Sequence, residues 1–108
     1  DFLLERTSNV ILACAAWKNR INIEDTLFAG AVINRIKSHF EINCDASQIA
    51  ETLYLQANGD LLNFMKEKNA SHYHRLMNFG LEEDIRFCLT PDNANICCLY
   101  SGGRLVAG

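Results

Sequence analysis

The sequence feature that most constrains the fold lies between residues 9 and 40. There, an apolar run of strand length is followed by a polar loop and then by a capped helix. The run itself, residues 9–14, reads Asn-Val-Ile-Leu-Ala-Cys and is apolar on both faces of an extended chain. A run of this kind is typical of a central strand covered on both sides, as in parallel α/β sheets. The sequence therefore predicts a strand that leads through a loop into a helix.

Asn22 and Asp25 mark the predicted beginning of that helix. Asn is a favoured N-cap residue, and an acidic residue three positions later resembles a capping box. Apolar residues then recur at helical spacing as far as Phe40. Gly30 lies within this helix, where glycine costs up to about 1 kcal/mol relative to alanine. We therefore expect another helix to approach closely at Gly30.

The rest of the chain predicts further helices and a terminal hairpin. Helix starts are expected at Asp45, Asp60 and Ser71, and one more helix over residues 82–89. Residues 2–6 resemble the last turns of a helix, and residues 95–100 and 104–106 predict two strands joined by a tight turn. With 108 residues, the chain fits one mixed α/β domain that is helix-rich in its middle.

Composition narrows the function classes. The formal net charge is −3, without the basic excess typical of nucleic-acid-binding proteins, so we expect no nucleic-acid partner. No apolar run approaches the roughly 20 residues that a membrane-spanning helix needs, so we expect no membrane partner. The five cysteines are an odd number without a C-x-x-C motif. This pattern favours reduced, mostly buried thiols in a cytoplasmic protein over a disulfide framework or a zinc site.

The loop over residues 15–25 is the first candidate site, because open α/β sheets bind ligands where a strand ends and a helix begins. Lys18 and Arg20 are two cations that could bind an anion. Glu24 and Asp25 would repel a phosphate unless Mg²⁺ bound between them and the phosphate. The alternative is that both carboxylates only stabilise the helix dipole, by about 0.3 to 1 kcal/mol each, and that both cations are solvated.

The second candidate site is the sequence Ser-His-Tyr-His-Arg over residues 71–75. His72 and His74 point about 200° apart on a helix, which disfavours a shared metal. His72 and Arg75 share one face and could bind an oxyanion together, or could simply be solvated. Cys14 is a weaker candidate nucleophile, because burial in an apolar strand would raise the pKa of its thiol.

Two separated motifs resemble the 2-phosphosulfolactate phosphatase family. Residues 14–32, Cys-Ala-Ala-Trp-Lys-Asn-Arg-Ile-Asn-Ile-Glu-Asp-Thr-Leu-Phe-Ala-Gly-Ala-Val, resemble its Cys-Ala-Gly loop and Leu-Glu-Asp helix start, with Ala16 and Asn19 where glycines are expected. Residues 71–88 resemble its second signature through Ser-His, Arg-Leu, Gly80 and Asp-Ile-Arg-Phe-Cys. Residues 102–106 match its C-terminal end, so the resemblance spans about residues 9–106.

The resemblance implies a layered α/β/α fold, helix-rich with a small mixed sheet, and a Mg²⁺-dependent phosphoric monoester hydrolase. Such enzymes hydrolyse 2-phosphosulfolactate, an anionic phosphate ester, in coenzyme M biosynthesis. Family members also carry an N-terminal half with an Asp-Val-Leu-Arg-Ala-Thr segment. Residues 1–108 are therefore predicted to be the C-terminal domain, inactive alone, with that half as a partner. The oligomeric state stays open, a homo-oligomer included.

The two candidate sites and the resemblance together give the expected site residues. Glu24, Asp25 and His72 are expected to be catalytic, with Glu24 and Asp25 as the Mg²⁺ ligands. The expected substrate-binding residues are Lys18, Arg20 and Arg75. Two alternatives remain: a non-catalytic binding module that keeps the family fold, and a thiol hydrolase that uses Cys14. Convergence of the predicted loop residues on one cleft would favour the enzyme over the module.

Overall fold

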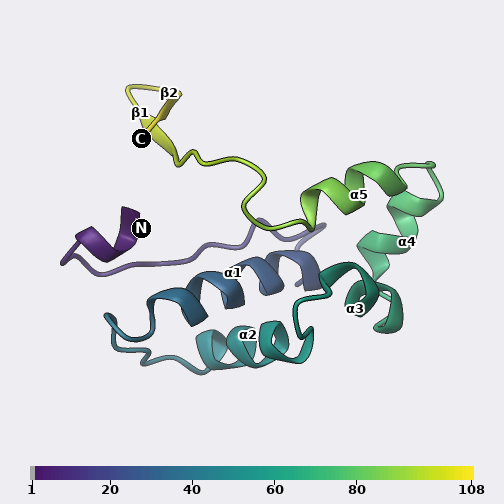
Figure 1. Ribbon diagram of the computed structural model, residues 1–108, viewed down its shortest axis with the longest axis horizontal. Helices are drawn as coiled ribbons and strands as arrows, with labels where there is room; N and C mark the ends of the chain where they lie inside the picture. Colours follow the sequence, from purple (N-terminus) through teal and green to yellow (C-terminus); the bar gives the residue numbers. More distant parts are fainter. Residues whose placement is uncertain (1) are drawn as a thin grey trace.

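The computed structural model describes residues 2–108, and within them it is helix-rich with one small sheet (Figure 1). This confirms the predicted helix-rich α/β class. No helix among the described residues is long and apolar enough to cross a membrane. In chain order the elements are the 3-10 helix η1 (Phe2–Glu5), α1 (Ile23–Ile36), α2 (Asp45–Gln56), α3 (Leu61–Glu67), α4 (Ser71–Met77), α5 (Glu82–Cys88), β1 (Cys98–Ser101) and β2 (Arg104–Ala107).

The helices α1 and α2 lie side by side and form the largest helix pair of the molecule (Figure 1). Their contact depends on Gly30, which is buried. A Cβ atom at Gly30 would collide with the carbonyl oxygen of Ala50 and would lie 2.8 Å from the Cβ of Tyr54. The close helix approach predicted from this glycine is therefore confirmed.

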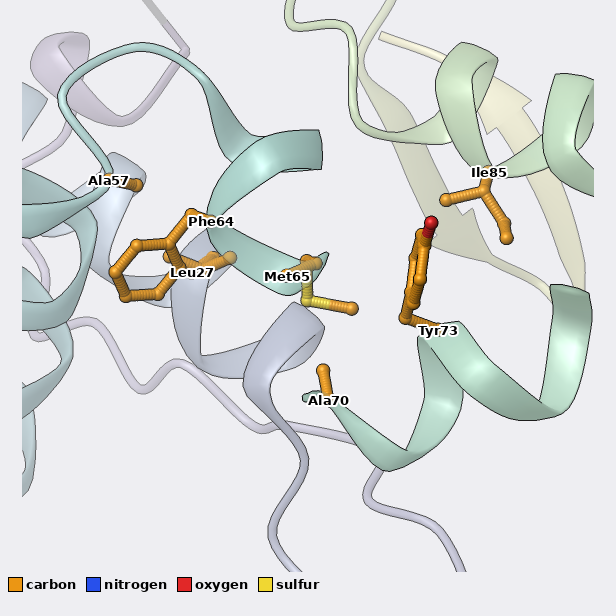
Figure 2. Close-up of a cluster of buried hydrophobic side chains, with 7 residues drawn as sticks. All are labelled: Leu27, Ala57, Phe64, Met65, Ala70, Tyr73 and Ile85. Atoms are coloured by element: carbon orange, nitrogen blue, oxygen red, sulfur yellow. The ribbon is translucent and has the colours of Figure 1, made fainter. Parts of the chain in front are cut away.

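A cluster of buried apolar side chains joins α1 to the three short helices (Figure 2). Leu27 of α1 and Met65 of α3 are the most deeply buried, each 2% exposed. Leu27 follows Glu24 by one helical turn, and Tyr73 of the same cluster is adjacent to His72. The cluster therefore holds two candidate site residues close together. Its members are Leu27, Ala57, Phe64, Met65, Ala70, Tyr73 and Ile85.

Two of the predicted N-caps are confirmed. The Asn22 Oδ1 atom accepts a hydrogen bond from the Asp25 backbone N–H at 2.9 Å, which starts α1. The Asp60 Oδ1 atom accepts one from the Asn63 backbone N–H at 2.9 Å, which starts α3. In both cases a side-chain oxygen satisfies a backbone donor that the helix leaves unpaired.

Two other predicted caps are each displaced by one residue. The N-cap of α2 is Cys44 rather than Asp45, because Cys44 has the extended backbone and its Sγ accepts from the Ser47 N–H at 3.4 Å. The N-cap of α4 is Ala70, which makes no side-chain cap, and Ser71 is already helical. Helix α1 also ends at Ile36, before Phe40, because the N–H groups of the next turn converge on one carbonyl.

The predicted central strand over residues 9–14 is wrong for this structure. The segment runs beside α1 (Figure 1), and Leu12 packs against the buried cluster of Ala29, Ile33 and Ala50. Its opposite face is open, since Ile11 is 91% exposed. No main-chain hydrogen bond joins it to another segment within residues 2–108. A strand needs a neighbour for its backbone groups, and the described chain supplies none.

The predicted terminal hairpin is confirmed, although its first strand begins at Cys98 and not at residue 95. Strands β1 and β2 pair antiparallel, with Leu99 opposite Val106 and Tyr100 opposite Leu105. Gly102 and Gly103 connect them with φ angles of 58° and 80°. Two consecutive residues at positive φ match the type I′ turn of a two-residue hairpin. Figure 1 shows the hairpin beyond the helices, at the end of the chain that follows α5.

Candidate functional site

The loop before α1 folds into a miniature hairpin. The N–H of Trp17 donates to the carbonyl of Arg20 at 3.1 Å, and the N–H of Arg20 donates back at 3.0 Å. Lys18 and Asn19 form the turn with φ angles of 52° and 59°, and Ala16 has φ 62°. Ala16 and Asn19 are the two positions where the family resemblance predicts glycine. The backbone therefore adopts the left-handed conformation that explains a glycine at both places.

The carboxylate of Asp25 holds this loop against the helix. The Ala16 backbone N–H donates to Asp25 Oδ2 at 2.8 Å. The Cys14 thiol lies 3.6 Å from the Asp25 carbonyl oxygen. Asp25 therefore positions the loop, and one of its two carboxylate oxygens is engaged there. This contact had no signal in the sequence beyond the capping position of Asp25.

Glu24 points to a different partner, His72 of α4. The distance from Glu24 Oε1 to His72 Nδ1 is 2.5 Å, with the two side chains 19% and 26% exposed. The two atoms lie within ion-pair distance, which places Nδ1 of the ring next to the carboxylate. Both carboxylate oxygens of Glu24 are buried, and neither has a partner with hydrogen-bond geometry among the described residues.

Arg75 lies over the same histidine. One terminal nitrogen of its guanidinium is 3.4 Å from both ring nitrogens of His72. The guanidinium carbon is 4.3 Å from the centroid of the Trp17 ring. The Nε atom of Arg75 is buried and has no hydrogen-bond partner within the described part of the chain. Trp17 is the site residue that sequence reasoning missed, and an aromatic ring between basic loop residues was its only signal.

The structure thus brings together three of the six predicted site residues, namely Glu24, His72 and Arg75. Lys18 and Arg20 are exposed, and neither forms an ion pair with any residue in the described range. The predicted loop residues therefore do not all converge on one cleft. His74 is also exposed, on the far side of the helix from His72, as its spacing predicts.

The prediction of Glu24 and Asp25 as joint metal ligands can be tested against their surroundings. Residues 2–108 contain no group of three or more His, Cys, Asp or Glu side chains arranged to hold a metal ion. Mg²⁺ needs only one or two protein carboxylates, with water and substrate oxygens completing its ligands. The unpartnered Oε2 of Glu24 fits that role. Asp25 fits it less well, because its Oδ2 already accepts from the loop.

The cysteines differ from expectation. All five are free; Cys97 is half-buried and the other four are exposed. The expectation of mostly buried thiols is therefore wrong, because these residues lie in the unpaired segment over residues 9–14, at helix ends and in or next to the hairpin, and not in the core. The exposed Cys14 hydrogen bonds to a carbonyl and not to a histidine. The base that a thiol hydrolase would need is thus missing from its described contacts.

Comparison with known proteins agrees with both sequence motifs. The family model described as 2-phosphosulpholactate phosphatase matches residues 1–103. The chain belongs to this family. Its curated relatives include a probable 2-phosphosulfolactate phosphatase of Synechocystis, 34% identical over 89% of this chain and 41% of the relative. Another, of Thermotoga maritima, is 35% identical over 82% of this chain and 37% of the relative.

The relatives are much longer than this chain. A third, the probable 2-phosphosulfolactate phosphatase of Clostridium botulinum strain Alaska E43, is 26% identical over 96% of this chain but only 43% of its own length. The chain therefore spans about two fifths of the curated relatives it matches, 41% in the case of Synechocystis. No solved structure matches it.

Proposed function

We propose that this chain is the C-terminal part of a phosphatase that hydrolyses 2-phosphosulfolactate or a related small phosphate monoester. The names of its relatives support the reaction class. The observation that assigns the proposed reaction to specific residues is the contact of Glu24 with His72, next to Arg75. Coenzyme M biosynthesis, implied by the family resemblance, belongs to the same proposal.

In this proposal, Glu24 and His72 act as a proton-transfer pair. Glu24 Oε1 orients the imidazole through Nδ1 and stabilises its protonated form. His72 Nε2 then accepts the proton of the attacking group, which is water or a side chain of the remaining enzyme. The new bond forms to phosphorus as the phosphorus–oxygen ester bond breaks, and the leaving oxygen takes the proton from His72 Nε2, so that an alcohol is released. If water attacks, phosphate is the other product; if a side chain attacks, water then hydrolyses the phosphorylated side chain and releases phosphate.

Arg75 is proposed to bind the phosphate. Its Nε–H is a donor without a partner among the described residues. An oxyanion is the acceptor that best matches a guanidinium, because two parallel N–H groups can bind two oxygens. Stacking on Trp17 holds the guanidinium plane in place. Lys18 and Arg20, exposed in the turn next to Trp17, are proposed to bind a second anionic group of the substrate.

Glu24 Oε2 is the proposed contribution of this chain to a Mg²⁺ site. When bound, the ion would offset the negative charge of the phosphate. Asp25 remains a candidate for a ligand through water, since only one of its carboxylate oxygens accepts from the loop.

A chimera tests the proposal, with this chain replacing the matching part of the Synechocystis relative. Glu24→Gln removes the charge that orients His72 and holds Mg²⁺, so we expect phosphate release from 2-phosphosulfolactate to fall at least about 100-fold. Helix content measured by circular dichroism should not change. The matched control is Glu83→Gln, an exposed carboxylate in the first turn of α5, which should keep full activity.

Two results would count against the proposal that this chain is part of a phosphatase. Activity unchanged by Glu24→Gln removes Glu24 from the reaction. A folded chimera that binds the substrate but releases no phosphate favours the binding module, an alternative that the exposure of Lys18 and Arg20 supports.

A further inference from the structure

We propose that residues 9–15, called here the open segment, form a β-strand that a partner polypeptide completes by main-chain pairing. The partner we infer is the portion of the longer protein that the relatives carry beyond the part matched by this chain. This inference concerns assembly and does not depend on the phosphatase reaction.

The backbone of the open segment is unpaired. Within residues 2–108, no main-chain hydrogen bond links residues 9–15 to another part of the chain. The first backbone donor that is engaged lies at its end, where the Ala16 N–H binds Asp25. A row of free N–H and C=O groups is the feature by which a sheet edge accepts another strand.

Burial alternates over residues 9–13 as it does in a strand. Val10 and Leu12 are half-buried, whereas Ile11 and Ala13 are exposed, and the alternation ends at Cys14, which is also exposed. Leu12 packs against the buried cluster that Ala29, Ile33 and Ala50 form, so this face of the segment rests on the cluster between α1 and α2. A period of two with one covered face is the pattern of a strand at the surface of a layer of helices.

The outward face is unsuited to water. Ile11 is 91% exposed, and residues 9–15 contain no charged side chain and no proline. Strands that stay at a free edge usually carry lysine, proline or a bulge that prevents pairing. The absence of such residues indicates that both the edges and the outer face of the open segment are covered in the assembled protein.

The segment is also held in place before a partner arrives. Leu12 anchors its middle to the helices, and the hydrogen bond from Ala16 to Asp25 anchors its end. A strand that is already extended loses little conformational entropy on pairing. This preorganisation favours addition of a strand over refolding of the chain.

The length of the relatives argues for the occupant. This chain covers 41% of the Synechocystis relative and 37% of the Thermotoga maritima relative, so the unmatched portion is the longer one. A portion of that length can supply strands on both edges and a layer over Ile11. A second copy pairing through the same segment would cover one edge and leave the other open.

Amide hydrogen exchange tests the proposal directly. The probe is the unmatched portion of the Synechocystis relative, co-expressed with this chain as a separate polypeptide. In this chain alone, the amides of residues 10–14 should exchange at unprotected rates. In the complex they should slow by at least about 100-fold, as main-chain pairing protects amides, and a one-to-one complex should elute on size exclusion.

Two substitutions separate pairing from folding. Ile11→Pro removes an exposed N–H and should weaken the complex at least about tenfold, because proline cannot donate to a ladder. The matched control, Ala94→Pro, lies in the exposed loop before β1 and should bind normally. Ala13→Lys, which keeps the backbone, should also weaken binding and leave the helix content unchanged.

Three results would overturn the proposal. The first is unprotected exchange of residues 10–14 in the co-expressed sample. The second is binding that Ile11→Pro and Ala13→Lys leave unaffected. The third is a dimer of this chain alone that protects the same amides, which would assign the surface to a second copy. The Glu24→Gln variant should still bind the partner and protect the amides of residues 10–14. A failure of the phosphatase proposal can therefore be distinguished from a failure of this one.

Discussion

Individual residues of the loop before α1 adopt backbone conformations that their side chains disfavour. Ala16, Lys18 and Asn19 all have φ between 52° and 62°. For an L-residue the left-handed region costs on the order of 1 kcal/mol, least for Asn. Two hydrogen bonds between Trp17 and Arg20, and the carboxylate of Asp25 on the Ala16 N–H, stabilise this conformation. These hydrogen bonds, which lie next to Glu24, thus offset the backbone strain of the loop.

The reactivity of the Cys44 thiol can also be predicted from its local contacts. The Ser47 hydroxyl, 3.3 Å from Cys44 Sγ, and the Ser47 backbone N–H lower the pKa of this thiol below its ordinary value. A lowered pKa means more thiolate at neutral pH, so iodoacetamide should label Cys44 with a midpoint at lower pH in the folded protein than in the urea-denatured protein. Ser47→Ala should move the midpoint upward.

The labelling is followed by mass spectrometry of peptides across a pH series, with the urea-denatured protein as the control. Equal midpoints for Cys44 in the folded and the denatured protein would show that the cap does not stabilise the thiolate. Ser47→Ala still leaves the backbone N–H in place, so we expect only part of the shift to disappear.

At the scale of elements, the α1–α2 contact and the α1–α4 contact depend on different chemistry. The first is a close backbone approach at Gly30, and the second is the ion pair between Glu24 and His72. Helices pack closely where a small residue allows it, whereas a half-buried ion pair specifies which turns face each other. The first contact therefore depends on backbone packing, and the second specifies which turns of α1 and α4 face each other.

Gly30→Ala tests the packing. The added methyl group would meet the Ala50 carbonyl, and we expect the free energy of unfolding to fall by about 1 to 3 kcal/mol despite the better helix propensity of alanine. Urea denaturation followed by circular dichroism measures the change. Phe28→Ala on the exposed face of α1 is the control and should change it by less than about 0.5 kcal/mol. If both substitutions changed the free energy of unfolding equally, the helices α1 and α2 would have moved apart to accommodate the added methyl group.

At the scale of the whole molecule, the site joins segments that are distant in sequence. The loop at Trp17 and the start of α1 meet α4, which the core cluster holds beside α1 (Figure 2). Leu27 and Tyr73 of this cluster neighbour Glu24 and His72 respectively. Burial of apolar surface therefore provides the free energy that aligns the polar groups.

The single tryptophan of the chain reports this assembly. Arg75→Ala removes the guanidinium 4.3 Å from the centroid of the Trp17 ring, which is 48% exposed, and we expect the emission maximum of Trp17 to shift to longer wavelength as water replaces the guanidinium over the ring. His74→Ala, on the opposite face of α4, should leave the spectrum unchanged. An unshifted spectrum for Arg75→Ala would show that α4 and the loop do not meet in solution.

Much of the fold could be predicted because its signals are local. Asn22 and Asp60 cap their helices through backbone donors three residues away, and Gly102 and Gly103 satisfy a turn by themselves. The two family motifs are likewise continuous stretches of sequence. Caps and turns are satisfied within a few residues, so the amino-acid sequence alone determined them.

Contacts between distant segments were decided by tertiary structure. The apolar run over residues 9–14 predicted a buried strand, yet pairing needs a neighbour that residues 2–108 do not supply. Glu24 and Asp25 are adjacent in sequence but have different partners, because Glu24 faces α4 and Asp25 faces the loop. Trp17 joined Arg75 only once the core had brought α4 to the loop. Such contacts depend on packing across the whole chain, which no local pattern encodes.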